Sequence, residues 1–189
     1  MNFIGVAVLS GTSLTLLGST VLDAQELSCG AQVSLCLPQG DLGASGFLDH
    51  RPGGGLGLQL GIAFPGGQVI VPRADLAEFR NAGKGDAKAR IYQVGVDYDW
   101  YPFTRRAWEG TYLGLGVGYG FTHYQQDAAS GRRSETPSNV TYALAAGYRF
   151  TRHLGAELRY TYIEFTPSFT GADSSTAAPI ANASLVFRF

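Results

Sequence analysis

The segment Thr111–Tyr124, TYLGLGVGYGFTHY, alternates strictly between two kinds of residue. One set is large and apolar (Leu113, Leu115, Val117, Tyr119, Phe121), and the other is nearly bare (Gly114, Gly116, Gly118, Gly120, Thr122). A period of two residues is typical of a β-strand whose faces meet different surroundings. Glycine weakens a strand unless something on that face needs the space. A narrow closed barrel needs that space inside, and its outer face can be apolar when the surroundings are lipid. The segment therefore predicts one strand of a small membrane barrel.

The composition agrees with this interpretation. The chain has 189 residues, which indicates one domain or at most two. Charged residues make up 15% of it, against roughly 25% in soluble domains. After the N-terminal segment, no run approaches the ~20 consecutive apolar residues of a membrane helix. The formal net charge is −1, and the absence of a basic stripe argues against a nucleic-acid partner.

The N-terminal segment has the character of an export signal. Met1–Leu22 contains no charged side chain, and Phe3–Leu17 is apolar enough for the central region of a secretory signal. We expect cleavage after Ala24, which makes residues 1–24 a signal peptide and residues 25–189 one barrel domain. The alternative, a membrane anchor, is disfavoured because the segment is rich in Gly, Ser and Thr and lacks flanking positive charge.

Seven further segments alternate in a similar way, so the sequence predicts an all-β fold, an eight-stranded antiparallel up-and-down transmembrane barrel. The eight expected strands are Gly30–Leu37, Gly54–Phe64, Gln68–Asp75, Lys88–Phe103, Thr111–Tyr124, Asn139–Phe150, Leu154–Phe165 and Pro179–Phe189. The third is the weakest because Pro72 removes a ladder donor. The connections are alternately short (65–67, 104–110, 151–153) and long (38–53, 76–87, 125–138, 166–178). Membrane barrels pair short periplasmic turns with longer extracellular loops in this way.

Aromatic residues gather toward the ends of the predicted strands. We expect one belt near the short turns, formed by Trp100, Tyr112, Tyr148, Phe150, Phe187 and Phe189. We expect a second belt nearer the long loops, formed by Tyr92, Tyr119, Phe121, Tyr142, Tyr160 and Tyr162. Two such belts mark the two interfaces of a membrane.

Cys29 and Cys36 raise a question of pairing. On one extended strand they lie on opposite faces, about 23 Å apart at ~3.3 Å per residue, which is beyond disulfide reach. Free thiols agree with the strand prediction, and a disulfide-closed N-terminal loop contradicts it.

Six charged residues fall on the inward-facing positions of the predicted strands. They are Asp97, Asp99, Arg149, Glu157, Arg159 and Arg188. A buried charge is costly unless it is paired, so we expect these side chains to form a lumen network in the half of the barrel nearer the short turns. The competing interpretation is that they form the solvated face of a soluble sheet. In the barrel, the network fills a lumen that is already narrow.

From about residue 54 to the end, the chain resembles the eight-stranded outer-membrane barrels of the OmpA/OmpX type. The resemblance rests on WYPF at Trp100–Phe103, YLGLGVGYGF at Tyr112–Phe121, YALAAGYRF at Tyr142–Phe150 and LVFRF at Leu185–Phe189. It implies a bacterial outer-membrane location and contact with outer-membrane lipid. It also implies that Phe187 and Phe189 end a closing strand that the barrel assembly machinery reads as a signal.

These observations favour a structural or surface-interacting, adhesin-like role, in which long loops meet host or extracellular ligands. Two alternatives stay open: a narrow channel for small solutes, and a soluble lipocalin-like barrel with reversed faces that binds an apolar ligand. We expect no enzyme, cofactor or metal, because His50, His123 and His153 have neither metal-ligand spacing nor a catalytic partner set. If the faces are as described, Val117→Arg on the lipid side should be costly and Gly118→Ser on the lumen side should be tolerated.

Overall fold

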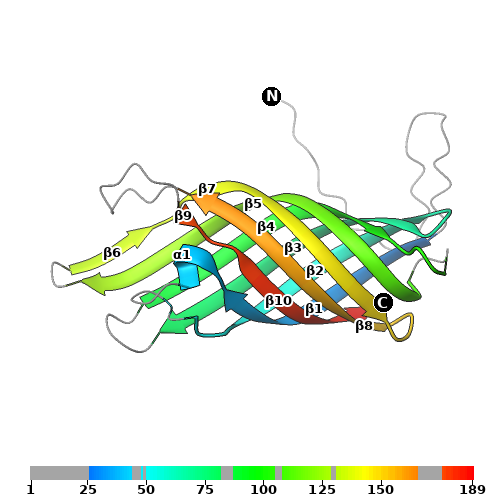
Figure 1. Ribbon diagram of the computed structural model, residues 1–189, viewed down its shortest axis with the longest axis horizontal. Coiled ribbons are helices and arrows are strands. Elements are labelled where there is room, and N and C mark those ends of the chain that lie inside the picture. The colour runs from blue at the N-terminus through cyan, green and yellow to red at the C-terminus, as the bar shows by residue number, and fades with distance from the viewer. Residues whose placement is uncertain are drawn as a thin grey trace, which may run out of the picture.

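The computed structural model describes residues 26–43, 48, 50–81, 87–104, 108–128, 131–165 and 176–189. The expected signal peptide, residues 1–24, lies outside these described residues. Eight long strands form the body of the molecule (Figure 1). They are β1 (Glu26–Pro38), β2 (Gly53–Phe64), β3 (Gln68–Asn81), β4 (Ala87–Trp100), β5 (Gly110–Ala128), β7 (Ser138–Arg149), β8 (Leu154–Phe165) and β10 (Ile180–Arg188). The short elements are α1 (Gly40–Gly43), β6 (Gly131–Glu135) and β9 (Thr176–Ala177). No helix among the described residues is long and apolar enough to cross a membrane.

The long strands close into an antiparallel barrel. Neighbours along the chain pair in sequence from β1 to β8, with β5 pairing with β7. Closure comes from β10, which pairs with β8 on one side and with β1 on the other. Every long strand is therefore hydrogen-bonded on both sides along most of its length, which leaves the barrel wall without an open edge. This confirms the predicted fold.

The two faces of the wall are arranged as the sequence predicts. In β5, Leu113, Leu115 and Val117 are all at least half exposed on the outside. The inward positions of the wall instead carry buried polar residues, among them Gln59, Arg73 and Asp97. An apolar exterior around a polar interior is the pattern of a membrane barrel. It is the reverse of what the lipocalin-like alternative requires.

The glycines of the inner face make room for large lumen side chains. A Cβ added at Gly116 would collide with Asp97 and meet Arg159 Nη2 at 3.0 Å. At Gly147 the ring of Tyr112 occupies the space that a side chain would take. The nearly bare face of β5 is therefore a recess for charged groups from β4 and β8, and Gly147 of β7 leaves room for the Tyr112 ring of β5.

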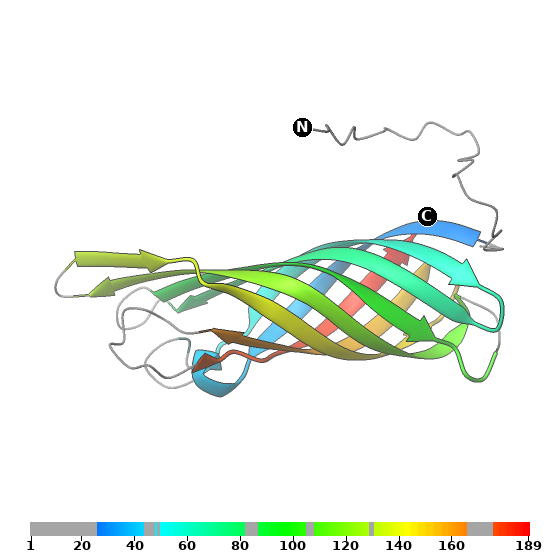
Figure 2. The same ribbon diagram turned by 90° about the horizontal axis from the view of Figure 1, so that it is seen from above.

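Several predicted boundaries need correction. The predicted loop 125–138 is largely a hairpin, because β5 continues to Ala128 and pairs with β6 in register Tyr124↔Glu135 to Ala128↔Gly131. Figure 2 shows this hairpin projecting beyond the rest of the barrel, at the end that carries α1 and β9. β3 also runs on to Asn81, past the predicted end at Asp75, since it pairs with β4 throughout. Pro72 is accommodated within that ladder opposite Val96.

The N-terminal strand shows whether Cys29 and Cys36 can form a disulfide. β1 is longer than predicted, and it contains both cysteines on opposite faces: Cys29 is exposed and Cys36 is buried. Both are free thiols, as the strand geometry requires.

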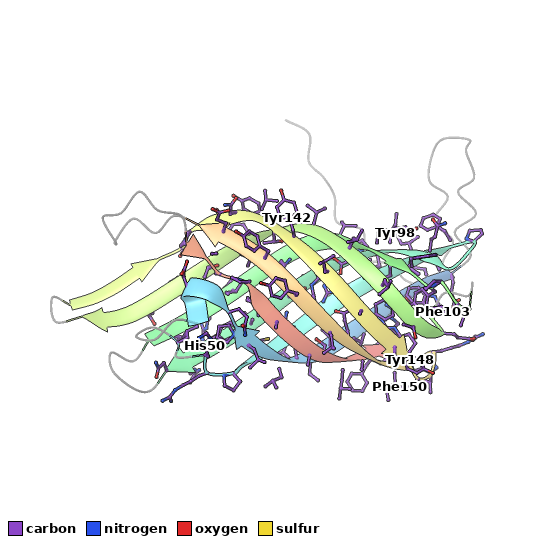
Figure 3. All side chains as sticks on the ribbon, viewed as in Figure 1. His50, Tyr98, Phe103, Tyr142, Tyr148 and Phe150 are labelled. Carbon is purple, nitrogen blue, oxygen red and sulfur yellow. The ribbon has the colours of Figure 1, made fainter. Side chains whose placement is uncertain are left out.

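The aromatic residues form the expected outer belts with one exception. Tyr148 and Phe150 project outward near the short turns, and Tyr142 lies further toward the long-loop end (Figure 3). Tyr112 was expected in the outer belt, but it is fully buried in the lumen. The reason is register: Tyr112 shares the face of Gly114 and Gly116, not that of Leu113.

Candidate functional site

The middle of the lumen contains an ion-pair network centred on Arg73 of β3. Its Nε lies 2.7 Å from Asp75 Oδ2, and its Nη1 lies 2.8 Å from Asp97 Oδ2 and 3.2 Å from Glu157 Oε1. Arg159 of β8 donates to both carboxylate oxygens of Asp97. The network thus joins the neighbouring strands β3 and β4 to β8, which pairs with neither of them, and it therefore crosses the lumen.

Neutral groups complete this network. Gln32 Nε2 donates to Asp75 Oδ1 at 2.7 Å, and the hydroxyl of Tyr112 donates to Glu157 Oε2 at 2.6 Å. Four of the charged side chains are almost fully shielded from solvent, namely Arg73, Asp97, Glu157 and Arg159. Charges buried this deeply are stable only with such partners.

An aromatic cluster closes the short-turn end of the lumen. Tyr101, Trp108 and Tyr112 are buried there, with the Tyr101 ring centroid 5.2 Å from that of Tyr112 and 6.5 Å from that of Trp108. The guanidinium carbon of Arg188 lies 3.7 Å from the Trp108 ring centroid, and that of Arg149 lies 5.1 Å from the Tyr112 centroid. Arginine stacks favourably on aromatic faces, so both cations pack against this cluster.

The long-loop end of the lumen is filled by apolar side chains. Phe79, Ile91, Ile163 and Ile180 point inward from four strands and are buried together with Leu48, which comes from the connection after α1. The α1–β9 region covers this cluster: Gln39 N donates to Pro179 O at 2.8 Å, and Ala177 N donates to Asp41 Oδ2 at 3.1 Å. The long-loop end of the lumen is therefore closed by a layer of side chains that carries no charge.

Between the apolar cluster and the ion pairs lies a lumen cavity of about 20 Å³, lined in part by Gln93, Thr161 and Asn182. A cavity of this size has room for about one water molecule. Three successive layers, apolar, ionic and aromatic, thus fill the described lumen from the long-loop end to the short-turn end.

All six sequence-predicted lumen residues are buried inside the barrel: Asp97, Asp99, Arg149, Glu157, Arg159 and Arg188. Asp97, Glu157 and Arg159 belong to the central network. Arg149, Arg188 and Asp99 lie apart from it, at the short-turn end. Arg188 donates to Ser28 Oγ at 3.2 Å, whereas the Arg149 guanidinium has no hydrogen-bond acceptor among the described residues.

The sequence interpretation missed the centre of the network. Arg73 and Asp75 occupy inward positions of β3, in phase with the buried Val69 and Val71. The alternation of that strand contained the signal, but Pro72, which lies between Val71 and Arg73, weakened the strand prediction.

The terminal strand closes the barrel as expected, and its last residue extends the ladder. Phe189 N donates to Cys29 O at 2.8 Å, and Cys29 N donates to Phe189 O at 3.3 Å. The Phe187 and Phe189 side chains face outward. Phe189 therefore contributes a backbone pair to the seam and an exposed ring to the surroundings.

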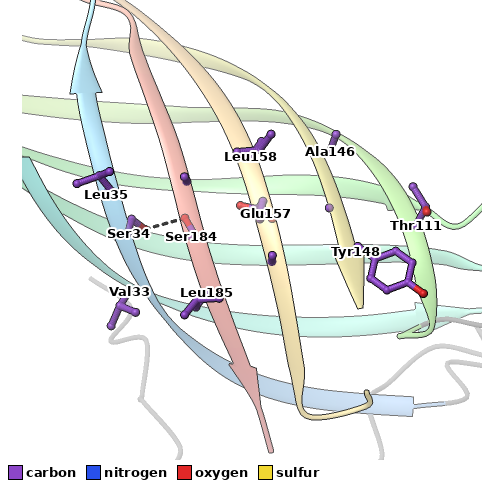
Figure 4. A pocket seen from close by; sticks show the side chains of 13 residues that line it. Val33, Ser34, Leu35, Thr111, Ala146, Tyr148, Glu157, Leu158, Ser184 and Leu185 are labelled. Carbon is purple, nitrogen blue, oxygen red and sulfur yellow. Dashed lines mark hydrogen bonds between the residues drawn. The ribbon is translucent and has the colours of Figure 1, made fainter. Parts of the chain in front are cut away.

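A shallow groove of about 700 Å³ runs across the outer wall over β1, β10, β8 and β7 (Figure 4). Small residues form its floor, namely Ala146, Ala156 and Ala183, and Val33, Leu35, Leu158, Leu185 and Tyr148 surround them. The groove lies on the lipid-facing side, whereas the Ser34–Ser184 hydrogen bond of 2.8 Å beneath it lies inside the wall.

The described residues include no group of three or more His, Cys, Asp or Glu side chains that could hold a metal ion. His123 Nδ1 lies 3.0 Å from the Thr136 hydroxyl, and His153 Nδ1 lies 2.9 Å from the Arg188 carbonyl oxygen. Both rings are thus engaged in local contacts near strand ends.

A closed barrel of eight long strands, with an apolar exterior and a filled polar lumen, defines a transmembrane β-barrel protein of the small, non-porin size class. Residues 13–189 match the family model described as "Outer membrane protein beta-barrel domain". The chain belongs to this family, and the membership indicates an outer-membrane location.

Solved structures with the same fold include Ail, the attachment invasion locus protein of Yersinia pestis. It has a TM-score of 0.60 and 14% identity over 86% of this chain and 97% of Ail. The N-terminal barrel of Pseudomonas aeruginosa OprF gives a TM-score of 0.57 at 8% identity, covering 85% and 97% of the two chains. Neisserial surface protein A gives 0.52 at 12% identity, covering 86% and 95%. At these identities the likeness shows the fold alone. A search of curated proteins found no match.

Proposed function

We propose that this protein is a non-conducting outer-membrane barrel that presents its long connections to partners outside the cell, an adhesin-like role. The observation that carries the proposal is the filling of the lumen by three successive layers. A barrel whose interior is occupied by packed side chains offers solutes no path. Its function is then carried by the long connections that are exposed outside the membrane.

The β5–β6 hairpin is the strongest candidate for the interacting segment. It extends the wall past the other strands (Figure 2), and its five cross-strand pairs give a longer projection than a flexible loop would. Its sequence includes Arg132 and Arg133, which lie opposite Asp127 and Gln126 in the register. Arginine matches the geometry of sulfate and carboxylate groups. The similar fold of Ail has been crystallised in complex with the heparin analogue sucrose octasulfate, which supports a sulfated polysaccharide as the first ligand to test.

The test compares cells that display the full chain with cells that display a shortened variant, in which residues 126–135 are replaced by an Asn-Gly turn. Binding to immobilised heparin is measured, and heat-modifiable migration checks that both barrels fold. We expect at least a tenfold loss of binding in the shortened variant. Equal binding by both, or none by the full chain, would refute this role for the hairpin.

The remaining parts of the proposal concern export and assembly. Residues 1–24 act as the signal peptide, with cleavage after Ala24, and the terminal strand bearing Phe187 and Phe189 is read by the barrel assembly machinery. N-terminal sequencing of the mature protein tests the first point. A narrow channel for small solutes is the alternative function, and the conductance experiment argued in the Discussion separates the two.

A further inference from the structure

The outward face of β3, β4 and β5 carries an ordered set of rows near the long-loop end. The backbone register places three rows across these strands: Leu76–Tyr92–Phe121, then Glu78–Arg90–His123, then Arg80–Lys88–Gln125. The first row is apolar and aromatic. The next two rows contain Arg80, Lys88 and Arg90, which we call the rim cations.

The rim cations point away from the lumen. The residues that alternate with them, Phe79 and Ala89, are fully buried inside the barrel. The side chain of Arg80 is 69% exposed, and those of Arg90 and Lys88 are 40% and 26% exposed. They therefore share the outer surface with the lipid-facing residues of the same strands.

Their height relative to the membrane follows from the strand geometry. Tyr92 and Phe121 belong to the belt that marks the edge of the hydrocarbon region. Two residues farther along a strand tilted by about 40° correspond to roughly 5 Å along the membrane normal. The Arg90 row thus lies just above the aromatic row, at the depth of lipid headgroups, and the Arg80 row lies one step farther out.

The rim cations surround a single carboxylate. Glu78 lies 2.8 Å from Arg90 Nε and 3.4 Å from Lys88 Nζ, and Arg80 Nη2 lies 2.5 Å from its Oε1. These three cationic neighbours favour the ionised form of the Glu78 carboxylate. Three cations and one anion leave a net charge of +2. Two guanidinium groups and one ammonium group also have more donors than one carboxylate can accept.

We propose that Arg80, Lys88 and Arg90 bind the phosphate groups of an anionic lipid in the outer leaflet of the membrane. Basic residues at the membrane surface attract anionic headgroups, and the planar guanidinium groups of Arg80 and Arg90 suit phosphate oxygens. Glu78 holds the three cationic groups together in the unbound protein. The acyl chains of the bound lipid lie against the apolar row of Leu76, Tyr92 and Phe121 below.

The proposal rests on insertion of the barrel in the membrane and is independent of the adhesin-like role. Other charged residues of the described outer wall do not form such a group; Glu164 on β8, for example, lies beside Tyr162, 3.4 Å from its hydroxyl. The rim cations therefore give the barrel one lipid-binding side.

The experiment measures lipid binding to the full folded chain in detergent by native mass spectrometry. The probe is diphosphorylated lipid A, and the same lipid without phosphate is the lipid control. Each cation at a membrane surface contributes about a fivefold effect on binding. We expect Arg90→Gln to bind the probe about fivefold more weakly, and the variant Arg80→Gln/Lys88→Gln/Arg90→Gln roughly a hundredfold more weakly.

Further variants test whether the position and the net charge of the patch determine binding. Arg51→Gln, in the connection after α1, and Arg152→Gln, in a short turn, also remove exposed cations and should leave binding unchanged. Glu78→Gln raises the net charge of the patch from +2 to +3 and should strengthen binding by about fivefold. Heat-modifiable migration shows that each variant is folded.

Three results would overturn the proposal. The first is equal retention of the phosphorylated and dephosphorylated lipids. The second is weaker binding by Glu78→Gln, which would exclude net charge as the basis. The third is displacement of the lipid by low millimolar inorganic phosphate, which would assign the site to a free anion.

Discussion

Arg73 is the residue on which most of the lumen ion pairs converge. It contacts Asp75, Asp97 and Glu157 and is itself almost fully buried. Removing one partner of a buried ion pair leaves uncompensated charge and costs about 3–5 kcal/mol. We therefore expect Arg73→Ala to lower the free energy of unfolding by that amount, measured by urea unfolding from lipid vesicles. Arg152→Ala is the matched control, because Arg152 is exposed in a short turn and such surface substitutions change stability by about 0.5 kcal/mol or less. Similar costs for the two variants would contradict the assignment of the stabilising network to the lumen.

Val117 tests which face meets lipid. Its side chain is 54% exposed on the outer wall, in the middle of β5. Arginine at the bilayer midplane of a barrel costs about 2–4 kcal/mol, so Val117→Arg should lower the free energy of unfolding from vesicles by that amount. Val117→Leu, which keeps an apolar side chain in the same place, should change it by less than about 1 kcal/mol. A small effect of the arginine would mean that water reaches this face.

The structure changes the expectation for Gly118. A Cβ at this position would lie 2.5 Å from the Val94 carbonyl oxygen and 3.0 Å from the Gly95 Cα. Backbone atoms cannot move aside as a flexible side chain can. Gly118→Ser is therefore expected to destabilise the barrel, and it is unsuitable as the neutral lumen control that alternation alone suggested.

Among the elements, β10 has two roles that one experiment can separate. It closes the wall through backbone pairs with β1 and β8, and its last side chains are the predicted assembly signal. Deleting Phe187–Phe189 removes both, so outer-membrane abundance should fall sharply in a fractionation assay. The double variant Phe187→Leu/Phe189→Leu keeps the backbone ladder and an apolar face. Low abundance of this variant, with normal folding of the purified chain, would support the signal. Normal abundance would leave β10 with its closing role alone.

Strands with strict alternation were predictable from sequence, and those without it were less so. β8 agrees with its prediction at both ends, since Leu154–Phe165 alternates throughout and begins directly after a short turn. The β5–β6 hairpin was missed because residues 125–135 are mostly polar, so no apolar period marks the strands. Leu48 could not be assigned to the lumen, because it lies outside the predicted strands and no alternation indicates where its side chain is buried. The inward direction of the lumen charges was predictable from the alternation of residues along each strand. Their partners were not, because pairing across a barrel depends on the register between distant strands.

At the scale of the whole molecule, the question is whether the barrel conducts. An eight-stranded barrel has an interior just wide enough for side chains to fill, and here apolar, ionic and aromatic layers fill it in turn. Ion passage would require all three layers to open together. We expect the wild-type protein in planar bilayers to be silent or to show small, rare openings.

Arg159→Ala should loosen the ionic layer. Arg159 donates to both oxygens of Asp97, while Arg73 reaches only one of them. Without Arg159, the Asp97 carboxylate keeps one partner and gains space beside it, which water can enter. Planar-bilayer recordings should then show more frequent openings than in wild type. The openings should remain small because the apolar layer around Phe79 and the aromatic layer around Trp108 are intact.

Tyr142→Phe removes only a hydroxyl from the outer wall and serves as the control, with no change expected. A large and steady wild-type conductance would refute the filled lumen and make a channel for small solutes the better function. Unchanged recordings for Arg159→Ala would show that the apolar and aromatic layers alone keep the barrel closed.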